Sequence, residues 1–205
     1  MKNKDKLLNA LTSSGLQCKG INDDDLKIFL SACGDLGVTL SFDHIDVLKI
    51  INGAPLGGGL AGTHYIKLGC SGIPKILYDT EWLLNNRIVP VAADGCGNYF
   101  GYLDRNDLAE YEYGLINYYE SSQFIERGHV NVQRSPVVAS NVTIFAAMWI
   151  ESFAAPISPR FAEIFLNRSS LENYDPELIR LKNDYNINIL AVEGGGSRWP
   201  EIKLD

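Results

Sequence analysis

The chain has 205 residues, of which 46% are hydrophobic and 21% charged. These shares are those of an ordinary globular protein and exclude a disordered chain, so we expect one folded domain with added ends. The formal net charge of -7 argues against nucleic acid as a partner, because phosphate binding needs clustered Lys and Arg, and it favours encounter with a basic protein.

The apolar stretches are too short for export or membrane insertion. The run from Leu7 to Leu11 falls short of the apolar core of a signal peptide, and Ile144 to Ile150 falls far short of the roughly 20 residues of a membrane span. The four cysteines, at positions 18, 33, 70 and 96, form no close pair and no zinc-ligand spacing. We therefore expect a reducing, cytoplasmic location.

The first third of the chain predicts helices. Apolar residues recur at helical spacing in residues 4–11 and 23–32, and a clearer helix begins at Ser41. Its predicted inner face carries Phe42, Ile45, Leu48 and Ile51, and Asn52-Gly53 predicts a left-handed C-terminal cap. Next we expect a glycine-rich loop over 54–62, a strand over 64–68, and a short helix over 79–85 with Trp82 inward.

Residues 88–93 and 99–103 predict a hairpin around Asp94-Gly95-Cys96-Gly97, because Asp-Gly tolerates the positive φ angles of hairpin turns. Two registers remain open. If Gly95-Cys96 forms the turn centre, Val89 faces Tyr102; if Asp94-Gly95 does, Val89 faces Phe100. Pro90 cannot donate a ladder hydrogen bond, so its strand lies at an edge or is bulged there.

The rest of the chain predicts an α+β fold, a central antiparallel sheet flanked by helices. Further strands are expected over residues 114–119 and 129–132. Helices are expected over 143–153, which is apolar on nearly every side, over 159–166, and from Asp175-Pro176 to Tyr185. A strand over 187–192 and a flexible glycine tail follow.

No catalytic constellation emerges from the sequence. The histidines, at positions 44, 64 and 129, have no acid or nucleophile at catalytic spacing, and Cys96 has no recognisable base. Asp94, Asn98 and Asp104 lack the spacing of a calcium loop, and the glycines of 57–62 lack a phosphate-loop motif. We expect no enzymatic activity, no metal and no cofactor.

Aromatic and acidic side chains gather around the predicted hairpin. Some must belong to the core, but strands alternate, so others should point outward, where Tyr and Trp beside carboxylates suit a protein-binding surface. For this set as a whole, a place in an interface and a place in the core remain equally supported. The set comprises Trp82, Tyr99, Phe100, Tyr102, Tyr111, Tyr113, Tyr118 and Tyr119 with Asp94, Asp104, Asp107, Glu110 and Glu112.

The hairpin resembles a known family. Val89-Pro90-Val91-Ala92-Ala93-Asp94-Gly95-Cys96-Gly97-Asn98-Tyr99-Phe100, followed by Leu103-Asp104, is similar to the signature hairpin of the SUKH (Smi/Knr-like) superfamily. Residues 40–53 are similar to that family's Leu-Pro helix ending in Asn-Gly, with Ser41 in place of the usual Pro. The likeness extends over residues 36–166.

Membership would imply a SUKH-like α+β domain over residues 36–170, with a helical extension at 1–35 and a helix-strand extension at 171–205. It would also imply no enzymatic activity and work done by protein binding. Bacterial members resemble immunity proteins that neutralise a cognate toxin, and fungal relatives regulate cell-wall signalling. We therefore expect an immunity protein that docks on a toxin domain, the alternative being a regulatory scaffold with several partners. The predicted partner-binding residues are Trp82, Asp94, Tyr99 and Asp104.

Overall fold

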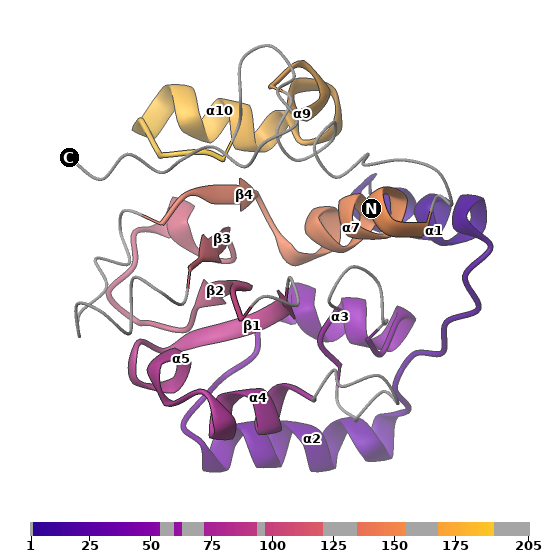
Figure 1. Cartoon of the computed structure of the whole chain (residues 1–205), viewed down its shortest axis with the longest axis vertical. Coiled ribbons are helices and arrows are strands. Elements are labelled where there is room, and N and C mark those ends of the chain that lie inside the picture. The colour runs from indigo at the N-terminus through magenta and orange to yellow at the C-terminus, as the bar shows by residue number, and fades with distance from the viewer. Residues whose placement is uncertain are drawn as a thin grey trace.

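The computed structural model describes residues 2–53, 60–62, 72–93, 97–120, 135–154 and 168–190. Within them the chain forms one α+β domain, in which helices surround a four-stranded antiparallel sheet (Figure 1). The helices are α1 (Lys2–Ser14), α2 (Asp23–Asp35), α3 (Phe42–Ile50), α4 (Ile73–Asp79), α5 (Glu81–Asn85), the 3-10 turn η1 (Glu110–Glu112), α7 (Val142–Ala154), α9 (Arg168–Tyr174) and α10 (Pro176–Tyr185). The strands are β1 (Ile88–Ala93), β2 (Tyr99–Leu103), β3 (Ile116–Tyr119) and β4 (Val137–Ala139).

The predicted hairpin is confirmed as the antiparallel pair β1 and β2. Its register combines the first of the two predicted alternatives with a bulge: Val89 pairs with Tyr102, whereas beyond the bulge Ala92 pairs with Phe100. The irregularity lies between Pro90 and Ala92, and β1 is the edge strand of the order β1-β2-β3-β4. Pro90 therefore sits where a missing N–H donor is tolerated, at an edge and beside a bulge.

The second half of the sheet differs in part from the prediction. Strand β3 forms within the predicted 114–119 segment, but its other partner is β4, a three-residue strand that the sequence pattern did not indicate. The strand expected over 129–132 lies outside the described residues. The strand expected over 187–192 is represented by a parallel bridge between Val137 and Ile189.

One face of the sheet carries the aromatic core. Phe100 of β2 contacts the rings of Phe145 and Trp149 of α7, each at 5.3 Å between centroids. Helix α7 lies between the sheet and α1, whose Leu7 is fully buried (Figure 1). The expected burial of α7 on nearly every side is confirmed, since Ile144 to Ile150 are all buried. The N-terminal segment is thus packed into the same core as the sheet.

Helix α3 begins at the predicted cap, with the Ser41 hydroxyl accepting the His44 N–H at 3.2 Å, and its predicted inner face is confirmed at Leu48 and Ile51 but wrong at Phe42. The buried residues are His44, Val47 and Leu48, and Phe42 is 89% exposed. The predicted stripe stepped by three residues each time. At about 100° per residue, nine residues turn the helix by about 180° relative to the start, which places Phe42 opposite Ile51.

The predicted left-handed cap at Asn52-Gly53 was also wrong. The helix ends at Ile50, and Ile51 is extended at φ -137° because the chain turns away to pair with residues 19–21: Asn52 N–H donates to the Lys19 carbonyl at 3.1 Å. Gly53 has φ +80° and lies against the backbone of residues 60–62, where a Cβ would meet Gly62 N at 3.1 Å. The glycine therefore serves a close backbone approach after the helix.

Two of the remaining helices begin at capping residues, and two others are too short for the sequence to predict. Asn22 caps α2, and Asp175 caps α10 while also accepting the Ser140 N–H and hydroxyl at 2.7 Å each. Helices α4 and α9 have seven residues each and too little periodicity to be predicted. The helix expected over 159–166 lies outside the described residues. None of the helices in the described part of the chain is long and apolar enough to cross a membrane.

Candidate functional site

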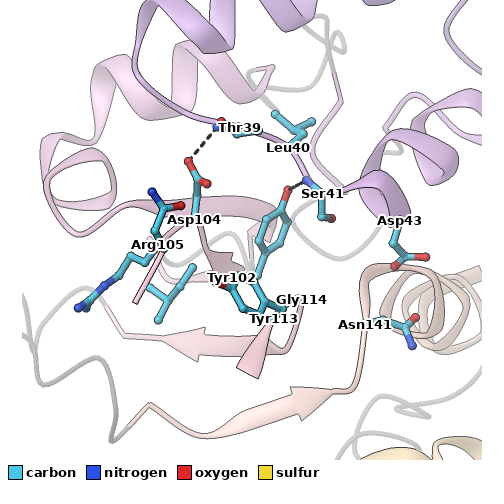
Figure 2. A pocket seen from close by; sticks show the side chains of 12 residues that line it. Thr39, Leu40, Ser41, Asp43, Tyr102, Asp104, Arg105, Tyr113, Gly114 and Asn141 are labelled. Atoms are coloured by element: carbon cyan, nitrogen blue, oxygen red, sulfur yellow. Dashed lines mark hydrogen bonds between the residues drawn. The ribbon is translucent and has the colours of Figure 1, made fainter. Parts of the chain in front are cut away.

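Among the described residues, a concave site lies where the hairpin meets the segment that joins α2 to α3. Its cavity, of about 290 Å³, is called the Tyr102 cavity below (Figure 2). Four stretches far apart in the sequence supply its walls: the α2–α3 segment, the end of β2, the β2–β3 connection and the start of α7. The lining residues are Thr39, Leu40, Ser41, Asp43, Tyr102, Leu103, Asp104, Arg105, Asn106, Tyr113, Gly114 and Asn141.

Tyr102 links the hairpin to α3 at this cavity. Its hydroxyl accepts the Ser41 N–H at 3.0 Å (Figure 2) and lies 3.1 Å from Nδ1 of His44. The hydroxyl can donate to Nδ1 or accept from it, so the tautomer of the His44 ring sets the direction of this hydrogen bond. Burial lowers the pKa of His44 to about 3, so the ring is neutral at physiological pH.

Asp43 links α3 to α7 on another wall. Its Oδ2 accepts the Thr143 N–H at 2.9 Å, and its Oδ1 accepts the Thr143 hydroxyl. Asn141 Oδ1 accepts the Ile144 N–H at 2.9 Å, so two of the unpaired donors of the α7 N-terminus are satisfied by side chains. The Asp43 carboxylate therefore has a structural partner and a helix N-terminus beside it.

Asp104 fastens the far end of the hairpin. Its carboxylate accepts the Thr39 N–H at 2.8 Å and a guanidinium N–H of Arg87 at 2.8 Å. The Asp104 N–H donates to the backbone carbonyl of Arg87 at 2.8 Å, and Arg87 Nε donates to the backbone carbonyl of Asp104 at 2.5 Å. Arg87 is held at φ +55°, a conformation that non-glycine residues rarely adopt, so this reciprocal set fixes a strained turn.

Two exposed aromatic side chains belong to the segments that form the walls of the cavity, and they are called its aromatic rim below. Tyr113 lines the cavity and is 54% exposed on the β2–β3 connection, and Phe42, which is 89% exposed, is next in sequence to the lining residues Ser41 and Asp43. Arg105 points away from the Thr39 and Asp104 pair (Figure 2) and forms an ion pair with Asp107 at 2.5 Å. The site thus combines a concave floor of bonded polar groups with apolar rings that face solvent.

The structure divides the predicted partner-binding residues into two groups. Trp82 and Tyr99 contact each other edge to face, with ring centroids 5.8 Å apart, and the Tyr99 hydroxyl lies 3.4 Å from the Thr80 hydroxyl. Asp104 follows the opposite end of β2, about 13 Å or more from Tyr99 at roughly 3.3 Å per residue. Asp94 lies outside the described residues.

The larger aromatic set separates into core and surface. Phe100, Tyr102, Tyr118 and Tyr119 are buried, Trp82, Tyr99 and Tyr111 are half-buried, and Tyr113 is exposed. Sequence reasoning missed Phe42 because its place in an apparent apolar stripe assigned it to the core. The spacing of His44, Val47, Leu48 and Ile51, at i, i+3, i+4 and i+7, is the signal that would have placed Phe42 outside the stripe.

The thiol and metal alternatives receive no further support from the described residues. Cys96 and residues 57–59 lie outside them, and burial raises the pKa of the Cys33 thiol to about 11. Within the described part of the chain, no three His, Cys, Asp or Glu side chains gather as metal ligands would.

Comparison with known proteins completes the description of the site. No protein-family model, curated protein or solved structure matches the chain. The likeness to the SUKH superfamily accordingly rests on the residues and spacing of the hairpin and of helix α3.

Proposed function

We propose that this chain is an immunity protein that neutralises a cognate bacterial toxin by docking on it, with the Tyr102 cavity and its aromatic rim as the contact surface. The main support is the exposure of Tyr113, which lines a cavity that is already formed, and of Phe42, which is next in sequence to two of its lining residues. Exposed aromatic rings next to a concave, preformed surface are typical anchors of protein interfaces.

The bonding within the cavity favours binding over bond-making chemistry. The polar groups of Tyr102, Asp43 and Asp104 each have a partner within the protein, namely His44, Thr143 and Thr39, at 3.1 Å or less. Groups used in this way hold the surface in shape and have little freedom to move protons to and from a substrate. A preformed surface also binds a protein with a small ordering cost.

The class of partner follows from the resemblance and the charge. The SUKH-like hairpin favours an immunity protein, and the net charge of -7 favours a basic partner over nucleic acid. We place the protein in the cytoplasm, which the free thiols of Cys18 and Cys33 support.

Co-purification with the products of neighbouring genes tests the proposal. The tagged full chain is expressed with each neighbouring reading frame, and captured proteins are identified by mass spectrometry. We expect one toxin domain in a stable 1:1 complex, with loss of its toxicity in cells that express the chain. Several partners of modest affinity would favour the regulatory scaffold, and the absence of any toxin-like partner would contradict the immunity function.

A further inference from the structure

Tyr113 lies between two cavities. Besides lining the Tyr102 cavity, it lines a second cavity of about 430 Å³ between η1 and α10. The other lining residues of this second cavity are Glu110, Tyr111, Ser140, Glu177, Arg180, Leu181 and Tyr185. Tyr113, whose ring is exposed, is common to both cavities, and together they are called the Tyr113 groove.

The second half of the groove is fixed by stacked aromatic rings. Tyr111 of η1 and Tyr185 of α10 stack with centroids 3.9 Å apart and planes inclined by 8°. Tyr185 nevertheless leaves 47% of its surface exposed, and Tyr113 leaves 54%. Tyr113 and Tyr185 therefore present aromatic surface in this half of the groove, while its walls are held by ring stacking and by the Asp175 cap of α10.

The groove carries an excess of negative charge. Four carboxylates line it, from Asp43, Asp104, Glu110 and Glu177, against the two guanidinium groups of Arg105 and Arg180. Both guanidinium groups are already bonded: Arg105 to Asp107, and Arg180 to Glu177 at 2.6 Å and Asp184 at 2.7 Å. Because these pairs lower the pKa of Asp107 and of Glu177, both carboxylates are ionised at neutral pH.

Glu110 contributes charge that is not compensated. It is exposed, and it forms no ion pair with another described residue. It lines the second cavity together with Glu177, Tyr111 and Tyr113. A Lys or Arg side chain placed there would meet both a carboxylate and an aromatic ring, the two features that attract organic cations in proteins.

We propose that the Tyr113 groove binds an extended basic segment of the partner protein, whose Arg or Lys side chains face Glu110 and Glu177 while its apolar residues contact Tyr113. This inference rests on the proposed function, because it names the chemistry of the surface that the partner presents. A nucleic acid would be repelled by the same carboxylates. The partner segment is therefore peptide in nature and positively charged.

A peptide array tests the proposal. The labelled full chain is applied to immobilised nonapeptides that have Arg at every second position and varied residues between, and to a matched array with Glu in place of each Arg. We expect binding to a subset of the Arg peptides and to none of the Glu peptides. Absence of binding to the Arg array, or equal binding to both arrays, would overturn the proposal.

Variants locate the binding. For the peptides that bind, we expect Glu110→Gln combined with Glu177→Gln, and separately Tyr113→Ser, to weaken affinity by about tenfold or more in fluorescence anisotropy. The matched charge control, Asp5→Asn with Asp23→Asn, removes the same charge from exposed positions on α1 and α2 and should leave affinity unchanged. The matched ring control is Tyr78→Ser on α4, where the side chain is exposed. Equal loss in the groove variants and their controls would contradict the proposal, and thermal unfolding verifies that each variant is folded.

The two proposals fail in different ways. If a neighbouring toxin binds with unchanged affinity to the groove variants, the groove proposal is wrong and the immunity function stands. If Arg peptides bind in the groove but no neighbouring gene product does, the immunity function is wrong and the groove proposal stands.

Discussion

The Tyr102 hydroxyl lies 3.1 Å from Nδ1 of His44, and both side chains are buried. The pair joins the signature hairpin to the helix that precedes it in the SUKH-like pattern, and it does so beneath the Tyr102 cavity. Their rings meet edge to face, with centroids 5.6 Å apart. The position of Phe42, two residues before His44, therefore depends on the hairpin.

This contact predicts acid sensitivity of the fold. Burial lowers the pKa of His44 from an ordinary 6.5 to about 3, so the unfolded chain binds a proton that the folded chain excludes. The stability that neutral His44 contributes is fully present above pH 6.5 and is lost as the pH falls from 6.5 towards 3, with a slope of up to about 1.4 kcal/mol per pH unit.

Urea unfolding of the wild type and of His44→Gln at pH 7.5, 6.0 and 4.5 checks this prediction. The variant should be less stable at pH 7.5, and its stability should fall less steeply with acid than that of the wild type. The exposed carboxylates titrate alike in both proteins, so they cancel in the comparison. Parallel pH profiles would show that His44 is not the group responsible.

The cap of α7 predicts a second effect on stability. Asp43→Ala removes the acceptor of the Thr143 N–H and hydroxyl, and we expect the free energy of unfolding to fall by about 1–2 kcal/mol. The control is Asp46→Ala, an exposed carboxylate on the same helix, with an expected change within about 0.5 kcal/mol. Chemical denaturation measures both, and equal costs would argue against the capping role.

The contact between Asp104 and Arg87 predicts unequal losses of stability when either residue is replaced. Asp104→Ala leaves Thr39 N–H without its acceptor and releases Arg87, so we expect a loss of about 1–2 kcal/mol. Arg87→Ala should cost less, about 0–1 kcal/mol, because the Arg87 side chain is 49% exposed and its ion pair is screened by water. Denaturation curves of the two variants decide the order, and a larger cost for Arg87→Ala would contradict this assignment.

The orientation of α3 about its axis predicts opposite effects on stability for substitutions at two of its apolar residues. Phe42→Ser should change the free energy of unfolding by no more than about 0.5 kcal/mol, because the ring is exposed. Leu48→Ala should cost about 2–5 kcal/mol, because that side chain is buried. Thermal or urea unfolding compares them directly. A large loss of unfolding free energy for Phe42→Ser would show that the ring is part of the core.

Local signals in the sequence account for much of the fold. The helix starts at Ser41, Asn22 and Asp175-Pro176 can be predicted because the capping hydrogen bonds form within one turn. Pro90 likewise constrains its strand whatever lies around it. These devices act over a few residues, so they can be read without the tertiary structure. The hairpin strands and the buried helix α7 also follow from local pattern.

Features that depend on distant partners could not be predicted. Strand β4 has three residues and exists because β3 and residues 188–190 lie on either side of it. Asp104 looked available for a partner, but its Oδ2 accepts hydrogen bonds from Thr39 and Arg87, which the sequence of one strand cannot predict. The candidate site shares this property, since Phe42, Tyr113 and Tyr185 come from three separate segments.

The central claim is that the exposed rim of the Tyr102 cavity is a docking surface for a protein. Isothermal titration calorimetry with the toxin domain that co-purifies with the chain tests it most directly. The wild type is compared with the rim variant, which combines Phe42→Ser with Tyr113→Ser. The control variant combines Ile28→Ser with Tyr78→Ser and so removes two exposed apolar side chains from α2 and α4. We predict that the rim variant binds about 100-fold more weakly or worse while the control binds like the wild type. Unchanged affinity of the folded rim variant would contradict the claim.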